Sequence, residues 1–228
     1  MTGLNPALLL LADGRFPAGG HAHSSGTEAA VKAGDVTDIA TLRLFVEGRL
    51  ATSGLVDAAF AAATCWRSAR PGDADWRELD AEYLARTGPP RLRLAARTLG
   101  RQLLRSGERA WPSSRYGEAR AALPDGVVQP IAMGVVANAA GCSPAEAALC
   151  ELHHLVGTLT TGAVRLLGLD PFIVAALGAS TAPELTRLAA LAASTCEHPA
   201  ANLPADLGLL NDVFAEHHGT WEVRLFAS

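Results

Sequence analysis

The sequence of 228 residues predicts an all-α fold, a single-domain helical bundle of roughly eight to ten helices. Three observations support this prediction. Alanine and leucine supply most of a hydrophobic content of 49%, whereas aromatic residues make up 5%, and both alanine and leucine are strong helix formers. Apolar residues recur at helical spacing in several segments. No stretch of useful length shows the alternation of apolar and polar residues that a half-buried strand needs.

Helix start signals and chain breaks give the order of the elements. Ser25-Gly-Thr-Glu28 fits a capping box, in which a hydroxyl and a glutamate three residues later satisfy free backbone N–H groups. Ser143-Pro-Ala-Glu146 combines such a box with proline at the first helical position. Residues 106–126 contain two prolines and several polar residues, which predicts a mobile connection with one short helix. The expected helices cover about residues 5–11, 25–33, 37–69 with a bend at Gly54, 75–86, 92–103, 128–140 and 143–167, and further helices begin near 170, 181 and 203.

The helix after Ser143 has the clearest pattern, with two opposite faces. Its apolar face is formed by Leu152, Leu155, Val156, Leu159, Ala163, Leu166 and Leu167. Its polar face is formed by Glu151, His154, Thr158, Thr161 and Arg165. One interpretation of the polar face is an ordinary solvated surface. The other is a polar contact line or channel wall, because threonine is a poor choice for a merely exposed helix position.

Charge and composition indicate which partners the protein can bind and in which cell compartment it is found. The net charge is −4 and neither sign runs in blocks, which argues against a nucleic-acid or anionic-membrane surface. No apolar run approaches a membrane span, and the short N-terminal one lacks the flanks of a signal peptide. With four scattered cysteines, we expect a cytoplasmic protein with reduced thiols. The surplus of apolar residues favours an obligate partner or a homodimer.

Catalytic motifs are missing from the sequence, so we expect a protein that is not an enzyme and has no cofactor. There is no Gly-x-Ser-x-Gly elbow, no phosphate-binding loop and no His-Glu-x-x-His pattern. Two alternative functions belong to other classes of protein. A helical ligand-binding or regulatory domain fits the composition but would need a basic recognition helix to bind DNA. A small metal-dependent hydrolase fits the histidines but would need three ligands that converge in space.

His21-Ala-His23 is the candidate metal pair of the sequence. Two imidazoles in a glycine-rich loop can bind nickel, copper or zinc through two nitrogens. Two ligands make a weak site, so a structural or partner-contacting role is favoured, and a metal role of His21 and His23 would be transient contact with nickel. His153-His154 lies on a helix where neighbouring side chains point to different faces, so a shared metal is not expected.

The chain end is unusually apolar, with Trp221, Leu225 and Phe226 around Arg224. Chain ends normally fray, so this tail either packs back on its own bundle or docks into a partner. Aromatic and arginine side chains are frequent anchors of protein interfaces. We therefore expect docking.

The segment from Leu8 to Glu28 resembles the N-terminal signature of the UreF family of urease accessory proteins. The residues that match in place are Pro17, Gly19, His23, Ser24, Gly26 and Glu28. Residues 94–104, Met133-Gly134, residues 163–166 and the terminal Arg-Leu-Phe-x-Ser are similar to family segments as well. The likeness follows the whole chain in the same order. It predicts one UreF-like domain over residues 1–228, with a signature loop at 13–28 and a docking tail at 217–228.

The resemblance implies a cytoplasmic homodimer that acts as a scaffold. Proteins of this family bind UreD, called UreH in some organisms, and recruit the GTPase UreG. Together they load apo-urease with nickel through a complex whose interior channels the ion, and an influence on GTP hydrolysis by UreG has been proposed. The partner-binding residues expected on this basis are Pro17, Gly19, His23, Ser24, Gly26, Glu28, Arg165, Arg224, Leu225 and Phe226.

The sequence departs from the family pattern at three places. His21 replaces an aromatic residue of the signature loop. Asp170-Pro171 replaces a Gly-Gln pair after the Arg-Leu helix, so a contact made by that glutamine is not expected here. His218-Gly219 stands where the family has His-Glu, and the usual Tyr-Ser before the tail is absent. We therefore expect the UreD contact to be built differently from that of the family, although its apolar anchors are kept.

Overall fold

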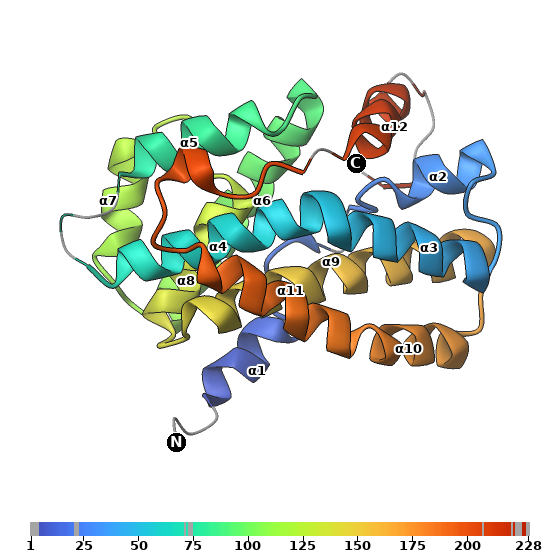
Figure 1. The fold of residues 1–228 in the computed structure, drawn as a ribbon, viewed down its shortest axis with the longest axis horizontal. Helices are drawn as coiled ribbons and strands as arrows, with labels where there is room; N and C mark the ends of the chain where they lie inside the picture. Colours follow the sequence, from blue (N-terminus) through green and yellow to red (C-terminus); the bar gives the residue numbers. More distant parts are fainter. Residues whose placement is uncertain are drawn as a thin grey trace.

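The computed structural model describes residues 5–20, 23–70, 72, 75–206, 208–219, 221 and 225–226, and every regular element in these ranges is a helix (Figure 1). The all-α prediction is confirmed. The elements are α1 (Pro6–Ala12), α2 (Thr27–Ala33), α3 (Ile39–Arg49), a π-helical turn (Leu50–Gly54), α4 (Leu55–Ser68), α5 (Trp76–Ala85), α6 (Pro90–Ala110), α7 (Arg115–Ala122), α8 (Gln129–Ala139), α9 (Pro144–Leu167), α10 (Pro171–Ser180), α11 (Ala182–Ser194), a 3-10 turn (Ala200–Asn202) and α12 (Leu209–Gly219).

Most helices begin where the sequence predicts. The Asn5 side chain caps α1 by accepting from the backbone N–H of Ala7 at 3.0 Å. Ser143 and Glu146 form the expected capping box at the start of α9. The Asp170 carboxylate caps α10 by accepting from the N–H of Phe172 at 2.8 Å. Each cap satisfies N–H groups that have no partner inside the helix.

The capping box predicted at Ser25 to Glu28 is wrong. Helix α2 begins after Gly26, which has a φ of +89° and provides no side-chain cap. A residue with a β-carbon would be strained at this φ, so the backbone itself calls for glycine. The N–H of Glu28 donates to Ser24 Oγ at 3.4 Å. The carboxylate of Glu28 binds the C-terminal tail instead, as described below.

The mobile connection predicted for residues 106–126 is wrong in part. Helix α6 continues to Ala110, and the short helix α7 follows after only four residues. Two glycines let α6 pack closely against the α8 region. A β-carbon on Gly100 would lie 2.0 Å from the Val127 carbonyl oxygen, and one on Gly107 would lie 2.5 Å from a Val136 methyl group. The continued helix therefore contributes to the core.

The long helix expected over residues 37–69 is divided, so the number of helices slightly exceeds the estimate. The break is a π-helical turn at Leu50–Gly54, in which Thr52 has φ −113° and ψ −107°. Such turns interrupt the regular helical hydrogen bonds and redirect the axis. The predicted bend at Gly54 coincides with this turn, where a β-carbon would lie 2.9 Å from the side chain of Leu155.

Helices α4, α8 and α9 form the centre of the molecule. Gly134 of α8 allows the closest approach, since a β-carbon there would lie 2.5 Å from the Ala61 carbonyl oxygen of α4. Figure 1 shows α10 and α11 along one side of this centre and α12 next to α2 near the C-terminal end of the chain. No helix within the described ranges combines the length and apolar content needed to cross a membrane.

Candidate functional site

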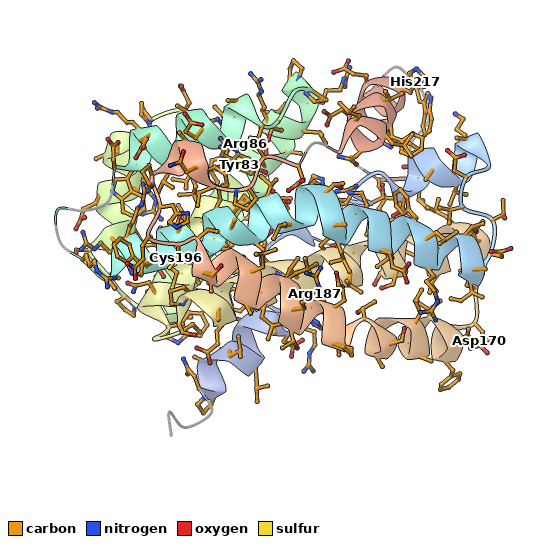
Figure 2. All side chains as sticks on the ribbon, in the orientation of Figure 1. Tyr83, Arg86, Asp170, Arg187, Cys196 and His217 are labelled. Atoms are coloured by element: carbon orange, nitrogen blue, oxygen red, sulfur yellow. The ribbon has the colours of Figure 1, made fainter. Side chains whose placement is uncertain are left out.

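A cavity of about 300 Å³ lies between the signature loop, the start of α4, the end of α5, the start of α6 and helix α9. Four residues of the polar face of α9 line it: Glu151, His154, Thr158 and Thr161. This placement is what the channel-wall interpretation of that face predicts. Tyr83 of α5 and Arg86, the residue that follows α5, are both labelled in Figure 2 and also line the cavity.

Several carboxyl groups line the cavity, and among them burial shifts those of Glu151 and Asp57 most. Glu151 is 6% exposed and accepts a hydrogen bond from Gln129 Nε2 at 2.9 Å. Burial raises the pKa of Glu151 to about 8, the charge of Asp57 adds to the rise, and the Gln129 bond opposes it. Burial also raises the pKa of Asp57 to about 6, although Tyr83 Oη donates to its carboxylate at 2.9 Å. Near pH 7 the Glu151 carboxyl is therefore mostly protonated.

Arg49 ties the signature loop to α12. It is 8% exposed, and its Nη1 donates to the Ser25 carbonyl oxygen at 2.5 Å and to Asn211 Oδ1. Its Nε donates to Ser53 Oγ at 3.1 Å. Burial lowers the pKa of Arg49 to about 10, so the guanidinium stays charged at neutral pH.

His154 brings an imidazole to the wall of the cavity. Its Nε2 is buried and has no hydrogen-bond partner among the described residues. Burial lowers the pKa of His154 to about 4, an effect that His153 increases and the backbone of Leu11 and Ala12 opposes. The ring is therefore neutral near pH 7. Within the described ranges no group of three or more His, Cys, Asp or Glu side chains is placed to hold a metal ion.

Glu28 binds the C-terminal tail, and we call Glu28, His218, Leu225 and Phe226 the Glu28 cluster. The backbone N–H of Leu225 donates to Glu28 Oε1 at 2.8 Å, and that of Phe226 donates to Oε2 at 3.1 Å. His218 Nε2 lies 2.9 Å from Oε2. Burial favours the neutral form of Glu28, but these hydrogen bonds together outweigh burial and lower the pKa of Glu28. His218, which the sequence leaves isolated, is part of the site.

Aromatic contacts hold the tail to the bundle. The Phe226 side chain is 5% exposed and closes one part of the cavity wall. The Arg165 guanidinium lies 5.6 Å from the Phe226 ring centre, and Lys32 Nζ lies 3.7 Å from the Trp221 ring centre. In the isolated chain the described part of the tail thus packs back on its own bundle, whereas we expected docking into a partner. The Leu225 side chain stays 63% exposed.

The remaining signature residues shape the loop between the cavity and α6. The Pro17 carbonyl oxygen accepts from Ser106 Oγ at 2.7 Å. Gly19 has a φ of +85°, and the Gln102 side chain occupies the space that a β-carbon would need. Ser24 is fully buried, and His23 lines the cavity with a pKa lowered by burial.

Two predicted site residues, His21 and Arg224, lie outside the described residues. The proposed nickel contact of the His21–His23 pair therefore stays a prediction. Sequence reasoning missed Arg49, Asp57 and Tyr83. A signal for Arg49 exists, because it lies seven residues after Leu42 on an otherwise apolar helix face.

Comparison with known proteins identifies the family of the chain. The sequence model of the UreF family matches residues 36–182. The chain is 40% identical over 227 residues to the urease accessory protein UreF of Mycolicibacterium vanbaalenii and 42% identical over 222 residues to that of Mycobacterium sp. strain JLS. The protein of the same name from Mycobacterium tuberculosis is 38% identical over 229 residues. Each alignment covers 97% of both chains.

Proposed function

The chain belongs to the UreF family of urease accessory proteins, and we propose that it is a non-catalytic scaffold for nickel insertion into apo-urease. In this proposal the chain bridges UreD and the GTPase UreG, and it influences GTP hydrolysis by UreG. Nickel is the cargo of the complex and not a resident cofactor. The proposal also includes a homodimer in the cytoplasm, as the sequence resemblance implies.

The observation that carries the proposal is the contact between the signature loop and the C-terminal tail at Glu28. The signature loop and the tail are about 200 residues apart in sequence, yet Glu28 binds the backbone of Leu225 and Phe226 directly. Hydrogen bonds between a charged carboxylate and backbone N–H groups are strong and fix orientation. The cluster therefore presents loop and tail as one surface. UreD would bind there, with the exposed Leu225 side chain as one of its anchors.

The cavity next to the Glu28 cluster supports a role in passing the cargo ion. Its wall includes oxygen and nitrogen ligands at Glu151, Asp57 and His154. Ions pass through a protein when the sites along the way bind weakly enough to release them. Nickel favours imidazole nitrogen, and the neutral His154 ring supplies one.

Exposed apolar side chains support binding to several partners at once. The large ones, each at least 41% exposed, are Leu9, Leu10, Leu44, Leu94, Phe172, Ile173, Leu191, Leu209, Leu210, Val213 and Leu225. Apolar side chains exposed in groups mark sites of protein association. A second copy of the chain and UreD would cover part of this surface.

Co-expression with UreD and UreG tests the proposal. We expect a joint peak in size-exclusion chromatography, and we expect the share of UreG in this peak to change when a GTP analogue replaces GDP. A partner that senses the nucleotide state can couple hydrolysis to release. Lack of any joint peak, together with substrate turnover or DNA binding by the chain alone, would overturn the proposal in favour of a hydrolase or a regulatory domain.

A further inference from the structure

Helix α6 carries a row of arginines on the side away from the cavity. Five arginines follow one another at intervals of four residues, namely Arg93, Arg97, Arg101, Arg105 and Arg109. A spacing of four residues is about 6 Å along a helix, so the row is about 24 Å long. Its last three members are exposed. We call Arg101, Arg105 and Arg109 the basic row.

Within the chain Arg97 pairs with a carboxylate and Arg93 is held by a backbone carbonyl oxygen, whereas the basic row has no ion pair among the described residues. Arg97 Nη2 lies 2.8 Å from Asp80 Oδ2, and Arg93 Nε donates to the Thr87 carbonyl oxygen at 2.6 Å. None of the three arginines of the basic row forms an ion pair with another described residue. The carboxylate within α6, Glu108, pairs with Arg120 of α7 at 2.7 Å.

This arrangement works against the stability of the isolated helix. Like charges four residues apart repel each other and destabilise a helix. The chain as a whole has a net charge of −4, so the basic row does not follow from the overall charge. An exposed row of one sign raises the rate at which a surface of the opposite sign associates.

Exposed apolar side chains on α6 and on α12, which contacts α6, point to a protein as the partner. Leu94 is 64% exposed and lies seven residues before Arg101, so it shares the same helix face. Helix α12 packs beside α6 and exposes Leu209 and Leu210 to 66% and 57%. Arginine combined with apolar anchors is typical of protein interfaces. Binding to nucleic acid rests mainly on phosphate contacts and makes little use of exposed leucines.

We propose that the basic row binds an acidic surface of a partner protein, in which carboxylates are spaced like residues i and i+4 of a helix. Guanidinium groups bind carboxylates through two parallel hydrogen bonds, so the matched spacing would fix the register of the two surfaces. This inference rests on the proposed function, because the partner would be UreD, UreG or apo-urease.

Paired substitutions in the full chain test this inference. Arg101→Gln with Arg105→Gln removes like-charge repulsion and keeps good helix formers, so the thermal midpoint should not fall. We expect binding to one of the three purified partners to weaken about fivefold near 0.05 M NaCl. The difference should vanish near 0.5 M NaCl, because salt screens exposed charges. The control, Arg70→Gln with Arg187→Gln, removes the same charge from exposed arginines elsewhere and should bind like the unchanged chain.

The outcomes separate this inference from the proposed function. If the unchanged chain binds a partner and the Arg101/Arg105 variant binds it equally well at both salt concentrations, the inference about α6 is overturned and the proposed function stands. If the unchanged chain binds none of the three partners, the proposed function fails and this inference fails with it. A 20-base-pair DNA duplex is the remaining probe. Binding of this duplex by the unchanged chain, lost in the variant, would identify a nucleic-acid surface instead and overturn the inference.

Discussion

Glu28 and Glu151 are both buried, yet their carboxyl groups are in opposite states. Their side chains belong to residues that are 9% and 6% exposed. Glu28 faces two backbone N–H groups and His218, and its pKa is lowered. Glu151 has a single amide donor from Gln129 and a neighbouring carboxyl at Asp57, and its pKa is raised to about 8.

The difference shows that the balance between burial and hydrogen-bond donors decides the pKa at each position. Loss of solvation acts on both groups in the same direction. At Glu28 the hydrogen bonds from the tail and from His218 outweigh the loss of solvation and lower the pKa, whereas at Glu151 burial prevails and raises it. Glu151 keeps its proton until a cation or a higher pH removes it. One glutamate is thus a fixed anchor, and the other is a wall residue whose charge depends on what enters the cavity.

The largest expected effect comes from removal of the anchor. Glu28→Ala leaves two backbone N–H groups and His218 without their acceptor, and we expect it to lower the free energy of unfolding by about 2–4 kcal/mol. Urea unfolding measures the loss, and limited proteolysis should show cleavage within the tail. Glu47→Ala, at an exposed position of α3, is the control and should change little. An equally stable Glu28→Ala variant with a protected tail would contradict the role of Glu28.

Replacing Glu151 by a neutral residue should raise the free energy of unfolding, whereas replacing Glu28 lowers it. The carboxyl of Glu151 loses its proton near 4.5 in the unfolded chain and near 8 in the folded one, so its contribution to stability falls as the pH rises between these values. Glu151→Gln removes this loss. We expect the variant to be about 1–3 kcal/mol more stable than the unchanged chain near pH 9 and nearly equal to it near pH 4. Parallel pH profiles of the two proteins would contradict the raised pKa.

A milder change at Glu28 sharpens the comparison. Glu28→Gln keeps one acceptor oxygen but loses the charge, and we expect a cost of about 1–2 kcal/mol at neutral pH. The lowered pKa of Glu28 means that its contribution is present above the unfolded value of 4.5 and is lost as the pH falls through the folded value. Amide hydrogen exchange of Leu225 and Phe226 near pH 4 and pH 7 measures this. Exchange that is equally slow in both proteins at both pH values would show that charge is not needed.

The smallest expected effect concerns the aromatic contact of the tail. Arg165→Gln removes the guanidinium over the Phe226 ring, which contributes about 0.5–1 kcal/mol at a site of this kind. Urea unfolding should show a loss within this range, with the Glu28 cluster intact by hydrogen exchange. A loss as large as that of Glu28→Ala would mean that Arg165 anchors the tail as strongly as Glu28 does.

Sequence patterns predict the helices well where caps and apolar spacing agree. The starts of α9 and α10 follow directly from Ser143 and Asp170, because these caps depend only on neighbouring residues. The capping box at Ser25 fails for a reason that no local pattern contains. The Glu28 carboxylate is bound by residues about 200 positions away, and this contact outweighs the local one.

The site is predictable only in part for the same reason. The family signature indicates Glu28 and Phe226 as important, and the polar face of α9 indicates a possible channel wall. Their meeting depends on how α2, α9 and α12 pack. Asp57 and Tyr83 give no signal because a lone carboxyl of α4 and a lone phenol of α5 become a pair only in the folded chain.

The nickel content of urease in cells tests the central claim most directly, namely that this chain is required as a scaffold for nickel insertion through the surface anchored by Glu28. Urease purified from cells without the chain should be present but poor in nickel. The unchanged chain should restore full nickel content, the Arg70→Gln with Arg187→Gln control should do the same, and Glu28→Ala should restore much less. Urease that is fully loaded with nickel in the absence of the chain would contradict the claim.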